Sequence, residues 1–229
     1  MRESSHVATI ARLRFRVADR DATEMITVWA YHHAGLLAVG STVASSVHQL
    51  KITLRSVRPP VWRRILVGSD MSLGELARVL EAAMGWLGGH LHVFDVKGTW
   101  YGSADPDWDS NDLDEDKYRL SEVLAAVGDK MRWNYDFGDG WEHDVLVEKI
   151  ADADPGVEYP LCLAGRRACP PEDCGGPSGY AELLKAFADL SHPDHEELRR
   201  WAPPGFDPAS FDVEDVNHSL RSPRPLEGW

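Results

Sequence analysis

Three cysteines, Cys162, Cys169 and Cys174, lie in one segment rich in proline and glycine, and the chain contains no others. Six residues separate the first two and four separate the last two. Thiolates select zinc and other soft metal ions, and a fourth ligand completes the tetrahedral site. The spacing differs from that of standard zinc fingers. Two interpretations therefore stay open: a zinc site, or buried cysteines in a tight loop.

The best candidate for a fourth ligand is His143, in the segment from Trp141 to Ile150. Alternate residues of a strand point to the same face, so His143 shares a face with the apolar Val145 and Val147. A histidine that points into a protein either binds a metal or forms hydrogen bonds in the core. The pattern predicts one Zn²⁺ site and indicates no other small-molecule cofactor. Its ligands would be Cys162, Cys169, Cys174 and His143.

Two further groups of residues have types suited to metal chemistry. His90 and His92 are neighbours on one face of an expected strand, where with a carboxylate they would form a metal site with an open position for water. Carboxylates and a histidine also gather around a predicted hairpin, where they would serve as base and ligands of a metal-dependent hydrolase. Turn chemistry and a polar strand face explain the same residues equally well. The hairpin group is Asp136, Asp139, Glu142 and His143.

Regular hydrophobic patterns predict the elements that must position these residues. Alternation predicts a strand that begins near His48 and another over residues 131–137. Ser72 followed by Glu75 has the form of a capping box and predicts the start of an amphipathic helix. Together these patterns predict an α+β fold. The expected core includes Leu80, Trp133, Tyr135 and Phe137.

Composition restricts the function classes that fit the chain. The chain has 229 residues and a formal net charge of −13, which disfavours a general nucleic-acid binder because such proteins present basic surfaces. An odd number of cysteines argues against a disulfide framework and for a reducing, cytoplasmic location. Residues 1–47 are predicted to be an N-terminal extension. Their apolar run, Met25–Ala44, is interrupted by His32, His33 and glycines, so we expect neither a signal peptide nor a membrane span.

One basic feature stands against this acidic background. Four arginines lie on or beside the predicted hairpin formed by residues 50–67: Arg55, Arg58, Arg63 and Arg64. They would either pair with the surplus of acidic residues on a solvated strand face or form a patch that binds nucleic acid.

Three sequence blocks, PPVWRR, DFGDGWEH and CPPEDCGG, occur in an order that resembles the Ri-plasmid open-reading-frame-three family, proteins also described as insertion-element passengers. The resemblance covers residues 48–202, leaving 203–229 as a C-terminal tail. It implies a compact α+β domain with a rolled antiparallel sheet and implies no known activity. A serine resolvase is not supported, because the chain offers neither the nucleophile among arginines nor the basic helix-turn-helix that such an enzyme needs.

Two functions from different classes follow. The first is a non-catalytic binding or accessory module of a plasmid or mobile element, with a protein or nucleic-acid partner, no membrane association and a structural metal site. The second is a metal-dependent hydrolase that uses the hairpin from Asp136 to His143.

Overall fold

The computed structural model describes residues 45–103 and 112–221. The described residues all belong to one compact unit. Its strands are β1 (Ser46–Leu54), β2 (Trp62–Gly68), β3 (His92–Val96), β4 (Thr99–Gly102), β5 (Leu113–Asp114), β6 (Lys130–Tyr135), β7 (Trp141–Asp152) and β8 (Leu161–Arg166). Its helices are α1 (Leu73–Met84), α2 (Leu120–Val123), α3 (Gly176–Ala188), α4 (His195–Trp201) and α5 (Val213–Arg221), with a short 3₁₀ helix at Glu115–Lys117.

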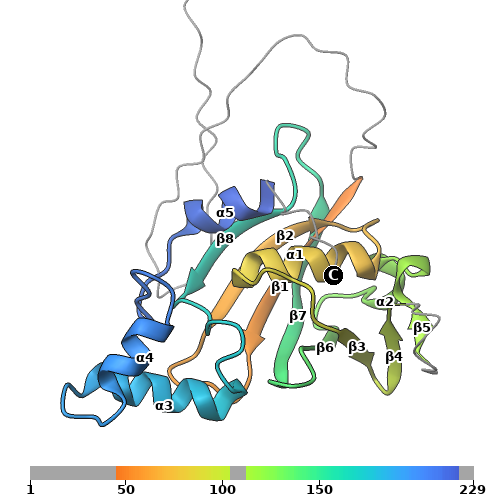
Figure 1. Cartoon of the computed structure of the whole chain (residues 1–229). Coiled ribbons are helices and arrows are strands. Elements are labelled where there is room, and N and C mark those ends of the chain that lie inside the picture. Colours follow the sequence, from red (N-terminus) through yellow and green to blue (C-terminus); the bar gives the residue numbers. More distant parts are fainter. Residues whose placement is uncertain (1–44, 104–111, 222–229) are drawn as a thin grey trace, which may run out of the picture. The chain divides into compact units, whose positions relative to one another are not determined.

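The strands form one eight-stranded sheet in the order β5-β4-β3-β6-β7-β1-β2-β8 (Figure 1). All pairs are antiparallel except the short β4–β5 pair. The predicted α+β class is confirmed. Sequence neighbours pair in the β1–β2, β3–β4 and β6–β7 hairpins, whereas β1 also pairs with β7, far along the chain.

A capping box begins helix α1, and a glycine ends it. The Ser72 hydroxyl accepts a hydrogen bond from the Glu75 backbone N–H at 3.1 Å, and the Glu75 carboxylate accepts one from the Ser72 N–H at 2.8 Å, so the predicted capping box is present. The helix ends at Gly85, whose φ of 89° is the left-handed conformation that glycine adopts without steric cost.

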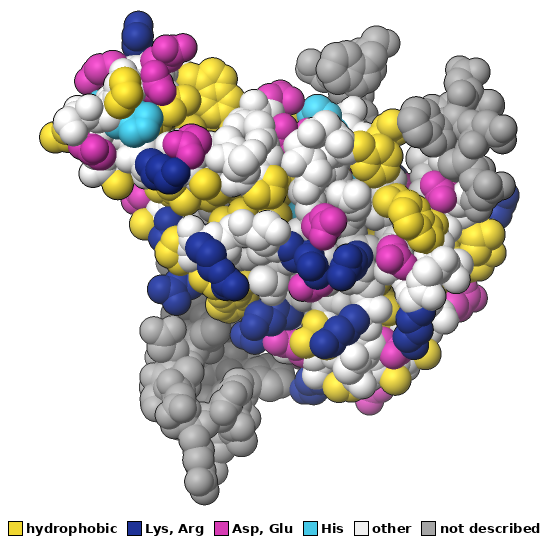
Figure 2. All heavy atoms as spheres, turned by 90° about the horizontal axis from the view of Figure 1, so that it is seen from below, with side chains coloured by type: hydrophobic (Ala, Val, Ile, Leu, Met, Phe, Trp, Pro, Cys, Tyr) yellow, Lys and Arg dark blue, Asp and Glu magenta, His cyan; other side chains and the backbone are white. Residues whose placement is uncertain are grey.

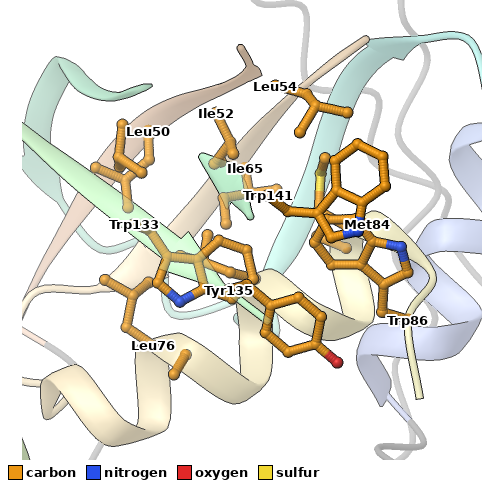
Figure 3. Packing of buried hydrophobic residues seen from close by; sticks show 14 of the residues in the cluster. Leu50, Ile52, Leu54, Ile65, Leu76, Met84, Trp86, Trp133, Tyr135 and Trp141 are labelled. Atoms are coloured by element: carbon orange, nitrogen blue, oxygen red, sulfur yellow. The ribbon is translucent and has the colours of Figure 1, made fainter. Parts of the chain in front are cut away.

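The core lies between α1 and the sheet, and aromatic rings fill its centre (Figure 3). Trp133 and Tyr135 of β6 are fully buried, as is Leu80 of α1, which confirms these three predicted core positions. Phe137 is 47% exposed, so its predicted burial is wrong. Strand β6 ends at Tyr135 and Asp136 adopts a φ of 55°, which takes the chain out of the extended conformation before the alternation reaches Phe137.

The two ends of the described segment add structure beyond residues 48–202. Strand β1 starts at Ser46, and Val47 is buried and paired with Gly68 and Ala151. Helix α5 lies within the residues that the sequence pattern assigns to a tail. It contacts α1 and β8 and buries Leu220. Among the described residues, we find no helix with the length and hydrophobicity that crossing a membrane requires.

Candidate functional site

The structure places the three cysteines in separate environments. Cys169 Sγ lies 3.3 Å from a guanidinium nitrogen of Arg63 and 3.7 Å from the sulfur of Met84. Cys162 lies in strand β8, where its backbone exchanges two hydrogen bonds with the side chain of Asn217. Cys174 lies closer to solvent, near Asp139. Burial raises the pKa of Cys162 and Cys169 to about 11 and that of Cys174 to about 12, so all three side chains are held as thiols.

His143 points into the core from β7, as the alternation predicts, and it is fully buried. Its ring packs against Trp133 and Trp86, at 4.7 and 5.3 Å between ring centroids, and Nδ1 donates a hydrogen bond to the Trp133 carbonyl at 3.2 Å. Burial lowers the pKa of His143 to about 3, although the carbonyls of Trp133 and Trp141 oppose the shift. The imidazole is therefore neutral at physiological pH, and its Nε2 has no hydrogen-bond partner among the described residues.

The four predicted zinc ligands do not form one cluster among the described residues, because their ligand atoms do not lie within 4.8 Å of one another. Zinc bound by the cysteines and His143 stays a prediction. The hydrolase group on the hairpin also separates: Glu142 points to the surface and pairs with Arg55 at 3.1 Å, while His143 points into the core.

A different set of metal-ligand side chains does converge. His90, Asp136 and Asp173 each offer a ligand atom within 4.8 Å of the other two. His90 Nδ1 lies 3.7 Å from Asp136 Oδ1, and His90 Nε2 lies 4.0 Å from Asp173 Oδ1. We call these three residues the corner cluster, because the proline- and glycine-rich loop meets the β6–β7 hairpin there. Two of the three, Asp136 and Asp173, belong to regions that the sequence analysis singled out, and His90 belonged to the rival metal site.

Backbone contacts position each member of the corner cluster. The Asp136 N–H donates to the Leu91 carbonyl at 2.9 Å, which places the end of β6 beside His90. The Asp136 side chain accepts hydrogen bonds from the N–H groups of Gly138 and Asp139 and is only 11% exposed. Asp173 is 77% exposed and, like Asp136, has a positive φ, at 58°. Sparsely populated backbone conformations of this kind are common in functional sites.

The loop that carries Asp173 is held against the sheet by specific contacts. The indole Nε1 of Trp86 donates to the Pro170 carbonyl at 3.0 Å, and the Tyr135 hydroxyl donates to Glu172 at 2.8 Å. The backbone of Gly176 approaches the Asp139 carbonyl so closely that any side chain at position 176 would collide with it. The loop and the hairpin therefore meet closely.

A second set of polar side chains lies near the corner cluster and α1, and it consists of Glu81, His92, Glu115 and Glu172. His92 Nε2 lies 2.9 Å from Glu115, which is 7% exposed, and Glu172 links this region to Tyr135. Glu81 lies in α1 on the buried face, and burial raises the pKa of its carboxyl; His92 opposes this shift and Glu172 adds to it. Buried carboxyls with a raised pKa are common at functional sites.

Sequence reasoning missed Glu81 and Glu115 as members of a site. A signal for Glu81 was present, since it follows Ala77 by four residues and precedes Met84 by three, on the apolar face of the helix. Nothing comparable marked Glu115, which lies in an acidic run.

The raised pKa of Glu81 leads to a test. The folded state favours the protonated carboxyl, so the contribution of Glu81 to stability is complete below its ordinary pKa of 4.5 and is lost as the pH rises through the raised value. We expect Glu81→Gln, which resembles the protonated form, to melt at a higher temperature than the wild type at pH 7.5, with a smaller difference at pH 4. Thermal unfolding in chelator measures this. An equal decrease in melting temperature at both pH values would contradict it.

The architecture defines a class: an α+β domain in which a loop rich in proline and glycine closes over one end of a mainly antiparallel sheet. The plasmid pRiA4b ORF-3-like protein family matches residues 46–215, and the chain belongs to this family. An uncharacterized protein of Sinorhizobium fredii, y4hQ, is 37% identical over 180 residues, 78% of this chain and 92% of the relative. A protein of unknown function from Methanosarcina mazei, MM3350, has a similar crystal structure, with a TM-score of 0.69 and 35% identity, covering 75% of this chain and 97% of that one.

Proposed function

We propose that this domain is an accessory binding module, of the kind carried by plasmids and insertion elements, that binds a divalent transition-metal ion at His90, Asp136 and Asp173. The observation that carries the proposal is the convergence of these three ligand atoms within 4.8 Å of one another. An imidazole nitrogen with two carboxylate oxygens suits zinc or manganese, since imidazole favours zinc and carboxylates favour manganese. Three protein ligands leave a position for water or for a group of a partner molecule.

The distances agree with a site that closes around an ion. Zinc binds nitrogen and oxygen ligands at about 2.0–2.2 Å, so two ligands of a tetrahedral site lie about 3.3–3.6 Å apart. The separations of 3.7 and 4.0 Å involve opposite nitrogens of the His90 ring, and one ion can bind only one of them, so the set to compare is the one whose atoms lie within 4.8 Å of one another. Closing that set around an ion requires side-chain shifts of about 1 Å. The same three side chains could also lie this close together without an ion, so metal content decides between the two explanations.

A bound ion would join three segments that are distant in sequence. His90 follows α1, Asp136 follows β6 and Asp173 belongs to the loop. Because the free energy of metal binding contributes to folding when the ligands come together only in the native state, the ion would stabilise the docked loop.

The experiment is metal analysis of protein purified without chelator or immobilised-metal chromatography. We expect about one zinc or manganese per chain in the wild type, retained in Cys169→Ser and lost in Asp136→Asn. Asparagine keeps an oxygen for the two backbone N–H groups and tolerates a positive φ, so this variant is expected to fold. Added metal at 100 times its dissociation constant should stabilise the wild type by about 2.7 kcal/mol.

Two results would contradict the proposal. Metal retained in Asp136→Asn and lost in Cys169→Ser would assign the ion to the cysteine loop instead. Metal-free wild type whose melting temperature does not respond to added zinc or manganese would show that the three side chains lie close together without binding an ion.

A metal-dependent hydrolase is the second candidate, and Glu81 favours it. A bound dication lowers the pKa of its water, and a buried carboxyl with a raised pKa is suited to hold and release a proton. Asp136 keeps its role as a ligand in this version, whereas Glu142 and His143 have none. Metal-loaded protein that hydrolyses an activated phosphodiester, and loses this activity in Glu81→Gln while keeping its metal, would establish the enzyme. A metal-loaded wild type without turnover would favour the accessory module.

A further inference from the structure

A groove of about 650 Å³ lies between the β1–β2 turn, helices α3 and α4, and residues 206–208. Its lining contains four basic residues and one acidic residue, a reversal of the balance in a chain with a net charge of −13. The charged residues are Arg58, Arg167, Lys185, Arg199 and Asp207. We call this the basic groove. Lys185 pairs with Glu182 at 2.7 Å, so the three arginines carry the charge that a ligand would meet.

Of the two alternatives for the four hairpin arginines, pairing with acidic residues holds for two of them, and the four do not form one basic patch. Arg63 is buried and donates hydrogen bonds to the carbonyls of Ala83 and Arg166. Arg64 pairs with Glu148, and Arg55 pairs with Glu142 and Asp144. Within the described residues, Arg58 alone among these four arginines is exposed and without an ion pair or side-chain hydrogen bond. Arg58 lines the groove together with Arg167 and Arg199, which lie more than 100 residues further along the chain.

Apolar groups form the rest of the groove lining. Phe187 and Phe206 are partly buried and pack edge to face at 6.0 Å, and the Arg199 guanidinium lies 4.4 Å from the Phe187 ring centroid. The remaining apolar lining residues are Pro59, Ala181, Leu184, Ala188 and Pro208. Arginines beside aromatic rings in a concave surface are the combination on which single-stranded nucleic acids bind, with phosphates on the cations and bases stacked on the rings.

We propose that the basic groove binds single-stranded nucleic acid through its phosphates. A duplex presents its phosphates on a convex cylinder with the bases stacked inside, so it would leave Phe187 and Phe206 unused, whereas a single strand can enter a groove and stack its bases. The acidic surplus elsewhere opposes binding only over short distances, because the Debye length is about 8 Å at physiological ionic strength. On the face seen in Figure 2, which includes the α3 end of the domain, Lys and Arg side chains lie across the middle, with Asp and Glu side chains among them.

The test is fluorescence anisotropy with a labelled 15-nucleotide oligo-dT, using the full chain in chelator so that the result is independent of metal at the corner cluster. We expect a dissociation constant of about 1–100 µM at 50 mM salt. Each phosphate contact of a single strand contributes about 0.7 to the slope of log affinity against log salt, so three contacts predict about a tenfold loss of affinity at 150 mM. The double variant Arg58→Ala/Arg199→Ala should bind at least tenfold more weakly at 50 mM salt and with a smaller slope.

The control is Arg200→Ala. Arg200 is the next residue of α4 and is also exposed, but it does not line the groove. This variant should bind like the wild type. Unchanged melting temperatures of the variants would show that lost binding is not lost folding. The proposal is overturned if the wild type does not bind at 50 mM salt, if the double variant and Arg200→Ala bind equally, or if duplex DNA or a phosphopeptide of matched charge binds more tightly than oligo-dT.

Discussion

Trp133→Ala should lower the free energy of unfolding by about 3–5 kcal/mol, because it removes a large buried aromatic side chain and leaves a cavity. Trp133 lies in β6, between β3 and β7, and none of its surface is accessible to solvent. Its ring centroid lies 6.1 Å from that of Trp86, just after α1, and 6.5 Å from that of Phe94 in β3. Figure 3 shows Trp133 and Trp86 within the buried cluster. The substitution therefore weakens packing between helix and sheet as well as within the sheet. Urea denaturation at pH 7 measures the loss.

Phe137→Ala is the matched control. Phe137 follows Trp133 by four residues and continues the same alternation, but 47% of it is exposed in the turn after β6. We expect a change within about 0.5 kcal/mol, as for most exposed positions. A Phe137→Ala loss as large as that of Trp133→Ala would mean that β6 continues beyond Tyr135 and that the described end of the strand is wrong.

Acidification should destabilise the protein through His143. Burial lowers its pKa to about 3 in the folded state, compared with an ordinary value of 6.5. Between these values the unfolded chain binds a proton that the folded chain excludes, so stability is complete above pH 6.5 and falls as the pH decreases toward 3. At 1.36 kcal/mol per unit, the loss attributable to His143 reaches about 3 kcal/mol by pH 4.5.

His143→Gln separates this effect from the titration of carboxylates, because glutamine does not ionise and all other groups remain. We expect the free energy of unfolding to fall by about 3 kcal/mol more in the wild type than in the variant between pH 7 and pH 4.5. The measurement is urea denaturation in chelator, which removes any contribution from acid release of a metal. Parallel pH profiles for the two proteins would show that His143 is not a buried neutral group.

The proposed metal site and the proposed nucleic-acid site lie in different parts of the domain. The corner cluster lies where the loop meets the β6–β7 hairpin, and the basic groove is lined by the β1–β2 turn and by α3 and α4. The variants that test each site share no residue. Loss of metal without loss of oligo-dT binding, or the reverse, would show that the two sites act independently.

The sequence by itself determined the elements whose signals lie within a few residues. The capping box at Ser72 and the alternation from Met131 to Tyr135 depend on backbone geometry and on side chains next to one another, so they predict α1 and β6 correctly. The inward direction of His143 followed from the same period of two. The prediction fails at Phe137, because the alternation of apolar residues does not show where the backbone leaves the extended conformation.

Only the tertiary structure decided which side chains meet. The sequence singled out the cysteine loop and the hairpin, but their contact brings together Asp173, Asp136 and His90, while Cys169 turns toward Arg63 and Met84. The basic groove likewise joins Arg58 to arginines of distant segments. The directions of these side chains depend on how the loop and helices pack against the sheet. These packing contacts join segments that lie far apart in the chain, so a local pattern of apolar residues cannot predict them.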